Sequence, residues 1–127
     1  MQHRHTVGQQ FVQAKADIDR VLRSGGVYVV NIIDGPPESF LRAEVATIAA
    51  VLPHVALLRG PSLLDGFIGN SVVVAGSEPL DVERWDALRR ERGDRGELVD
   101  DLTAYLDGAL VLTDDFAPVD QLIVGAR

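Results

Sequence analysis

The run from Val27 to Ile33 is the feature that most constrains the fold of this chain. It reads Val-Tyr-Val-Val-Asn-Ile-Ile, follows two glycines, and is followed by Asp34 and another glycine. A run so rich in apolar, β-branched residues is typical of a strand covered on both faces, as in a parallel or mixed α/β sheet. Because ligands of such sheets bind just beyond the carboxyl ends of the strands, Asn31 and Asp34 are candidate ligand-binding residues.

The composition is that of an ordinary globular protein. The chain has 127 residues, of which 46% are hydrophobic and 24% are charged, so we expect a single domain over residues 1–127 with a real core. The formal net charge of −7 argues against binding to nucleic acid or to an anionic membrane surface. It is compatible with a cationic small molecule or a basic partner, and solubility alone also accounts for it.

Several kinds of chemistry are excluded by what the sequence lacks. There is no cysteine, which removes disulfides, thiol nucleophiles and thiolate metal sites. His3 and His5 have no second ligand cluster, and no serine lies in a Gly-x-Ser-x-Gly elbow. We therefore predict no catalytic residue, no metal and no cofactor. Every apolar run is too short to span a membrane and the N-terminus lacks an apolar signal segment, so we expect no membrane contact and a cytoplasmic location.

Apolar periodicity predicts the elements along the rest of the chain. Helices are expected over residues 9–23, 39–52 and 97–106, and a further one is capped by Asp81 and ends near Gly93. Strands are expected over residues 54–58 and 71–75, the second antiparallel to the first. The strand–helix–strand unit of residues 27–58 predicts a right-handed crossover between parallel strands. Residues 59–70 are expected to form a loop, and the charge run of residues 89–95 a solvated face.

Local sequences in the order found here resemble spermidine synthases, the polyamine aminopropyltransferases. The resemblance rests on Gly25-Gly26-Val27-Tyr28-Val29-Val30-Asn31, on the helix of residues 40–52 leading into Pro53-His54-Val55, on Asn70-Ser71-Val72-Val73-Val74-Ala75, and on the closing residues 112–120. It spans residues 11–123, and corresponds to the C-terminal half of a full enzyme.

The resemblance implies an α/β fold, namely a partial Rossmann-like, methyltransferase-type three-layer unit. Its small mixed sheet would have about three strands with about four helices, and the strand of residues 71–75 would lie between the other two.

The reaction of that family moves an aminopropyl group from decarboxylated S-adenosylmethionine to putrescine. It needs a glycine-bearing turn for the nucleoside, a carboxylate that takes the proton from the attacking amine, and an acidic pocket for the diamine. In the family the first two come from the N-terminal half. This chain has no Gly-x-Gly-x-x-Gly and no strand-borne aspartate loop before Gly25. We therefore expect a protein that lacks the nucleoside-binding half and is inactive alone.

Four residues are candidates for substrate binding. Asn31 and Asp34 match positions that face the polyamine pocket of the family, while Asp114 and Asp115 could form an acidic pair. Two other interpretations remain open: Asp34 could form a turn with the glycine that follows it, and the later pair could serve turn and capping chemistry. Leu63 and Leu64 stand where the family carries a pocket tyrosine, which is a departure from its pattern.

Three functions follow from these observations. The first is a spermidine synthase-like half that associates with itself or with a partner. The second is a functional aminopropyltransferase subunit completed by a partner chain, and the third is a non-catalytic α/β module that binds a small ligand through the loop of residues 59–70. Loss of the N-terminal half would leave one edge of the strand from Val27 to Ile33 unpaired, so we expect a homo-oligomer, such as a dimer, or a partner chain there.

Overall fold

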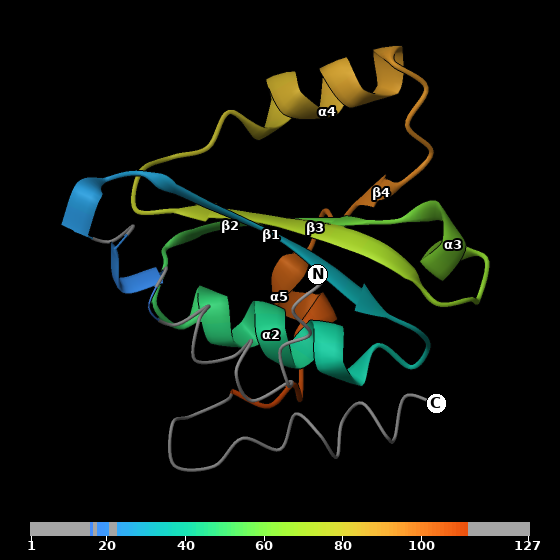
Figure 1. Ribbon diagram of the computed structural model, residues 1–127, viewed down its shortest axis with the longest axis horizontal. Coiled ribbons are helices and arrows are strands. Elements are labelled where there is room, and N and C mark those ends of the chain that lie inside the picture. Colours follow the sequence, from blue (N-terminus) through green and yellow to red (C-terminus); the bar gives the residue numbers. More distant parts are fainter. Residues whose placement is uncertain (1–15, 17, 21–22, 112–127) are drawn as a thin grey trace, which may run out of the picture.

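A computed structural model describes residues 16, 18–20 and 23–111 of the chain. Its elements are β1 (Val27–Asp34), α2 (Ser39–Ala49), β2 (His54–Arg59), α3 (Pro61–Leu64), β3 (Gly69–Gly76), α4 (Val82–Glu91), β4 (Glu97–Leu98) and α5 (Leu102–Tyr105). The sheet forms the middle layer, with α4 on one face and α2 and α5 on the other (Figure 1). The predicted three-layer α/β fold is therefore confirmed. The helix predicted over residues 9–23 lies largely outside the described residues.

The sheet has the strand order β1-β3-β2-β4, and every hydrogen-bonded pair of neighbours is antiparallel. Because β1 and β2 both run antiparallel to β3, they run parallel to one another, as the strand–helix–strand pattern predicts. β3 lies between them, which confirms the position expected for the strand of residues 71–75. The short β4 adds a fourth strand to the three expected.

The main core lies between the sheet and α2. Leu41, Val45 and Ile48 recur at helical spacing and are completely buried, and they share one cluster with Leu57 of β2 and Val73 of β3. These apolar positions stabilise α2 because a stripe at intervals of three and four residues lies on one face of a helix. The helix begins at the predicted residue and ends three residues earlier than predicted.

The outer face of β1 contradicts the prediction that this strand is covered on both sides. Side chains of a strand alternate between the two faces of the sheet. Tyr28 and Ile32 are buried on the α2 side, whereas Val27, Val29 and Ile33 on the opposite face are each more than half exposed. The apolar run therefore reflects one buried face together with an open apolar surface.

The helix predicted over residues 97–106 is correct only for α5 and wrong for the residues before it. Glu97 and Leu98 form β4, which pairs with the end of β2, and the backbone N–H of Val99 donates to the carbonyl of Leu57 at 3.0 Å. Asp101 then caps the short α5 by accepting from the N–H of Ala104 at 3.1 Å. The free edge of β2 supplies hydrogen bonds that a local helical pattern does not reveal.

The charge run of residues 89–95 is only partly a solvated face. The side chain of Arg89 is buried, pairs with Asp86 at 2.6 Å and donates to the carbonyl of Gly96 at 3.0 Å. Arg89 belongs to α4, and the N-terminus of this helix is capped by Asp81 as predicted, because its side chain accepts from the N–H of Arg84 at 3.3 Å. No helix among the described residues is long and apolar enough to cross a membrane.

Candidate functional site at the carboxyl ends of β1 and β2

Asp34 lies at the carboxyl end of β1, and its carboxylate is engaged by the backbone. The side chain is buried on the α2 side of the sheet. One carboxylate oxygen accepts from the N–H of Gly35 and the other from the N–H of Leu41, both at 2.9 Å. Leu41 lies in the first turn of α2, where N–H groups have no partner within the helix. Asp34 thus forms the turn with Gly35 that the sequence allowed, and it also caps α2.

Asn31 lies on the opposite face of the sheet from Asp34. Its side chain is exposed, and its Nδ2 donates to Oδ1 of Asn70 on β3 at 3.3 Å. The two residues are three positions apart on one strand, and an odd separation places side chains on opposite faces. The structure therefore does not bring together these two predicted polyamine-facing residues. Asp114 and Asp115 lie outside the described residues, and their role stays a prediction.

A cluster of charged and aromatic side chains does converge at this end of the sheet. Glu38, between β1 and α2, accepts two hydrogen bonds from Arg59 at the end of β2, at 2.8 Å from Nε and 2.7 Å from Nη2. It also accepts a hydrogen bond at 2.8 Å from the hydroxyl of Tyr105 on α5. Two parallel guanidinium hydrogen bonds fix the geometry of a carboxylate strongly. The cluster therefore ties β2, α2 and α5 together.

Arg42 of α2 completes this Glu38–Arg59–Tyr105 cluster. Its Nε donates to the carbonyl of Tyr105 at 2.9 Å, and its Nη2 donates to the carbonyl of Asp107. The guanidinium carbons of Arg42 and Arg59 lie 6.0 and 5.9 Å from the centre of the Tyr105 ring, at the outer limit of cation–π attraction. Burial and the hydrogen bond to Glu38 raise the pKa of Tyr105, so this hydroxyl remains a proton donor in neutral solution.

The sequence analysis did not identify this cluster or a role for the hydroxyl of Tyr105. The ring does pack against the core, but its hydroxyl serves the carboxylate of Glu38. One signal was present in the sequence. Since a crossover brings the carboxyl ends of two parallel strands to the same end of a sheet, opposite charges just after the first strand and at the end of the second are expected to meet. Glu38 and Arg59 occupy those two places.

Replacing Arg59 with methionine is expected to lower the free energy of unfolding by about 2 kcal/mol, because it leaves a largely buried carboxylate without its cation. The side chains of Arg59 and Glu38 are only 19% and 15% exposed. Urea denaturation measures the change. The control is Arg90→Met, which removes a surface pair with Asp86 at 3.3 Å and should cost about 0.5 kcal/mol or less. Equal losses in the two variants would contradict a stabilising role for the cluster.

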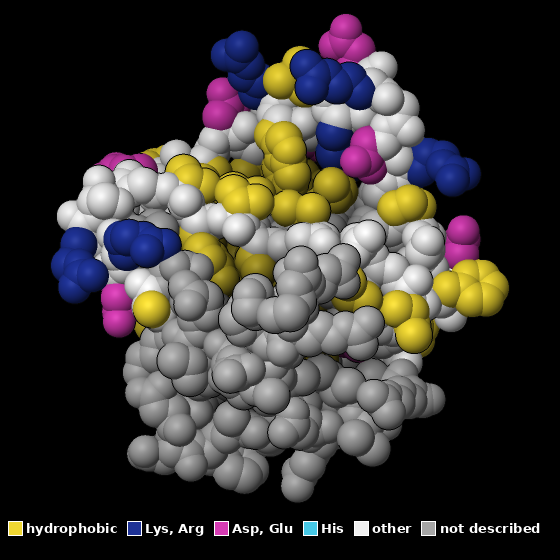
Figure 2. Space-filling model, in the orientation of Figure 1, with side chains coloured by type: hydrophobic (Ala, Val, Ile, Leu, Met, Phe, Trp, Pro, Cys, Tyr) yellow, Lys and Arg dark blue, Asp and Glu magenta, His cyan; other side chains and the backbone are white. Residues whose placement is uncertain are grey.

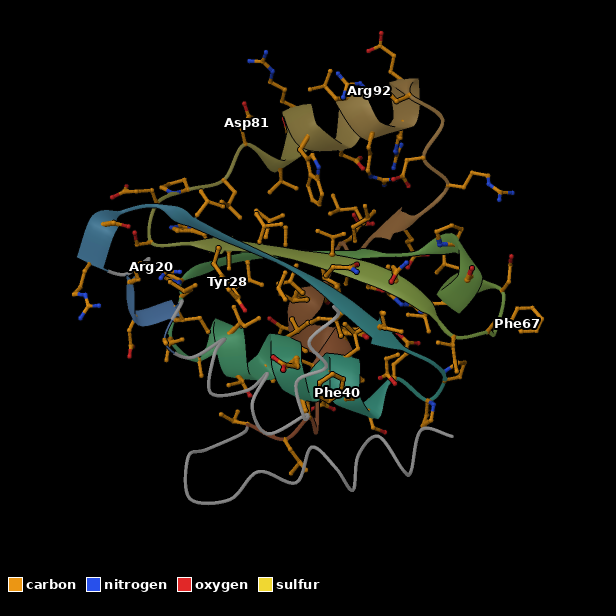
Figure 3. All side chains as sticks on the ribbon, viewed as in Figure 1. Arg20, Tyr28, Phe40, Phe67, Asp81 and Arg92 are labelled. Carbon is orange, nitrogen blue, oxygen red and sulfur yellow. The ribbon has the colours of Figure 1, made fainter. Side chains whose placement is uncertain are left out.

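The segment that the sequence predicts as a loop, residues 59–70, contains the single-turn helix α3. Leu63 in this helix is buried, whereas Phe67 and Ile68 after it are about two-thirds exposed. Phe67 projects from the end of the molecule, away from the sheet (Figure 3). Of the two leucines that stand where the family carries a tyrosine, one therefore packs inward. The other, Leu64, is at the border of exposure, so neither supplies a polar group for a diamine.

An apolar groove lies between α4 and the outer face of the sheet. Its volume is about 360 Å³, and it is lined by Val27, Val29, Ala56, Val72, Val74, Leu80, Asp81, Val82 and Trp85. Figure 2 shows apolar side chains gathered between α4, at the top of the view, and the layer below. The lining offers one carboxylate, which already caps α4. Nor does any group of three or more His, Asp or Glu side chains in the described ranges form a metal site.

The order of the elements defines the class of fold. A strand, a helix and a parallel strand, followed by a strand inserted antiparallel between them, form part of a methyltransferase-like Rossmann fold.

The structure is similar to the crystal structure of a probable spermidine synthase from Corynebacterium glutamicum, with a TM-score of 0.62 and 24% sequence identity. The match covers 73% of this chain and 37% of that protein, so the chain spans little more than a third of the enzyme it resembles. No protein-family model and no curated protein matches the sequence. At this identity, the likeness establishes the fold.

Proposed function

We propose that this chain is the acceptor-side half of a spermidine synthase-like fold, and that it does not transfer aminopropyl groups by itself. The nucleoside-binding turn and the proton-accepting carboxylate would come from residues that are not among these 127. The chain would associate through the edge of β1 that no described strand pairs. It would meet there either a second copy, which leaves the enzyme incomplete, or a partner chain that carries the missing half.

The fold likeness is the observation that carries this proposal. The likeness covers 37% of a probable spermidine synthase. The chain described here has no Gly-x-Gly-x-x-Gly of its own. The engagement of Asp34 supports it further. A carboxylate that accepts two backbone hydrogen bonds in a buried position is poorly placed to take a proton from an attacking amine, since a general base must reach the proton it removes.

Incubation of the purified chain with decarboxylated S-adenosylmethionine and putrescine tests the proposal directly. We expect no spermidine by mass spectrometry and no binding heat with an S-adenosylmethionine analogue, because the donor site is not in this chain. A complete spermidine synthase serves as the positive control. Turnover by the chain alone would overturn the proposal. Turnover that appears only after a second polypeptide is added would support it, and would identify the completed enzyme.

A further inference from the structure

The outward edge of β1 is unusually well suited to accept another strand. Within the described part of the chain, β1 pairs with β3 alone, although it is eight residues long. Its register with β3 is continuous, so no bulge interrupts it. Between Val27 and Ile33 it has no proline and no charged side chain. Proteins normally protect edge strands with such features, since an unprotected edge templates pairing with a further strand.

The side chains of β1 define which strand would fit this edge. On the α2 side, Ile32 is buried in the core and holds the strand in place. On the outer face, Val29 and Ile33 are 61% and 63% exposed and flank the polar Asn31. A complementary strand must therefore place apolar side chains beside these two residues. It must also leave a polar group beside the asparagine.

The strand that meets these requirements is β1 of a second copy. In an antiparallel pair, directly opposite residues have side chains on the same face of the sheet. The two-fold axis must therefore pass between two copies of the same residue, which lie opposite one another. An axis through Asn31 places Val29 opposite Ile33 of the second copy, twice by symmetry, and places the two Asn31 side chains together. An axis through Val30 instead sets Val29 opposite Asn31, which pairs an apolar side chain with an amide.

We propose that two copies of this chain associate by antiparallel pairing of their β1 strands about a two-fold axis at Asn31. The two four-stranded sheets become one continuous sheet, and the exposed valine and isoleucine become cross-strand pairs. The side-chain amide of Asn31 already donates to Asn70. In the dimer, its amide oxygen accepts a hydrogen bond from Asn31 of the second copy. This inference rests on the proposed function, in which the β1 edge is the place of association, and it names the partner.

Cysteine crosslinking of the full chain tests the register, because the natural sequence has no cysteine. Opposite residues in such a pair have Cβ atoms about 4.5–5.5 Å apart, close enough for a disulfide to form with small adjustments. We expect Asn31→Cys to give a disulfide-linked dimer under mild oxidation. Val29 is also exposed, but its own counterpart lies four residues away along the pair. Val29→Cys should therefore crosslink at least about tenfold less. Equal crosslinking of both variants would overturn the register.

Sedimentation equilibrium at micromolar concentration tests the association without any crosslink. We expect the natural chain to be a dimer and Val29→Lys to weaken it at least about tenfold, because a charge on the edge opposes strand pairing. Val51→Lys, at a half-exposed position just after α2, is the matched control and should remain dimeric. A monomeric natural chain would overturn the inference even if the chain is inactive. A dimer that makes spermidine would instead overturn the proposed function alone.

Discussion

Replacing the buried Glu44 with glutamine is expected to abolish a large pH dependence in the stability of this protein. Glu44 lies in the middle of α2 and is 7% exposed. Burial raises the pKa of its carboxyl from 4.5 to about 7, since the charged form loses its hydration. The folded state therefore holds the proton more tightly than the unfolded state does.

The direction of the effect follows from that difference. Below pH 4.5 the carboxyl is protonated in both states and carries no penalty. As pH rises from 4.5 to about 7, the unfolded state ionises first, so the free energy of unfolding falls by up to about 3 kcal/mol. Above about pH 7 the folded state ionises too, and the loss is complete. Glutamine has no such equilibrium, so the variant should keep this stability at alkaline pH.

Urea denaturation of both proteins near pH 4.5 and near pH 8 measures this effect. The difference between Glu44→Gln and the natural chain should grow by about 3 kcal/mol between the two conditions. Glu91→Gln is the control, because Glu91 is exposed at the end of α4 and its removal should leave the pH dependence unchanged. A constant difference between Glu44→Gln and the natural chain would show that Glu44 ionises freely in the folded state.

Replacing Gly60 with alanine is expected to cost about 3 kcal/mol or more of stability. Gly60 joins β2 to α3 in an extended conformation that any residue adopts. A Cβ atom there would lie 1.8 Å from the carbonyl oxygen of Asn70, far inside van der Waals contact. Since that oxygen belongs to the backbone of β3, the strand itself would have to move.

Gly66→Ala separates this steric effect from backbone strain. Gly66 has a φ of +91° and nothing within 4 Å of an added Cβ, so alanine there meets only the unfavourable left-handed conformation, worth about 1 kcal/mol. Thermal unfolding should show the larger loss for Gly60→Ala. A smaller loss at Gly60 than at Gly66 would mean that β2 and β3 separate easily at this end.

The elements predicted well are those in which local pattern and tertiary packing agree. Two such elements are α2, with its apolar stripe, and α4, with its cap at Asp81. Both are specified by neighbours a few residues away in the chain. The predicted helix over residues 97–106 failed at its start because the edge of β2, distant in the sequence, offered backbone partners to Glu97 and Leu98. A helical pattern of apolar residues is compatible with that pairing, and sequence alone does not reveal the competition.

The candidate site divides in the same way. The sequence identified Asn31 and Asp34 as residues near the carboxyl end of a strand, and the structure places both there. It did not predict that one faces solvent and the other caps α2, because strand parity was hidden by a run in which both faces are apolar. The Glu38–Arg59–Tyr105 cluster joins residues 21 and 67 positions apart, and depends entirely on the crossover.

The sequence by itself therefore determined that a β-branched strand after two glycines begins a strand–helix–strand unit. The type and order of these elements depend on local backbone preferences and on the periodicity of apolar residues. Only the tertiary structure decided that β4 pairs with the end of β2 and that the outer face of β1 is open. The reason is physical. Which face of an apolar strand is buried, and which of its edges is paired, depend on segments distant in the chain that compete for the same surface and hydrogen bonds.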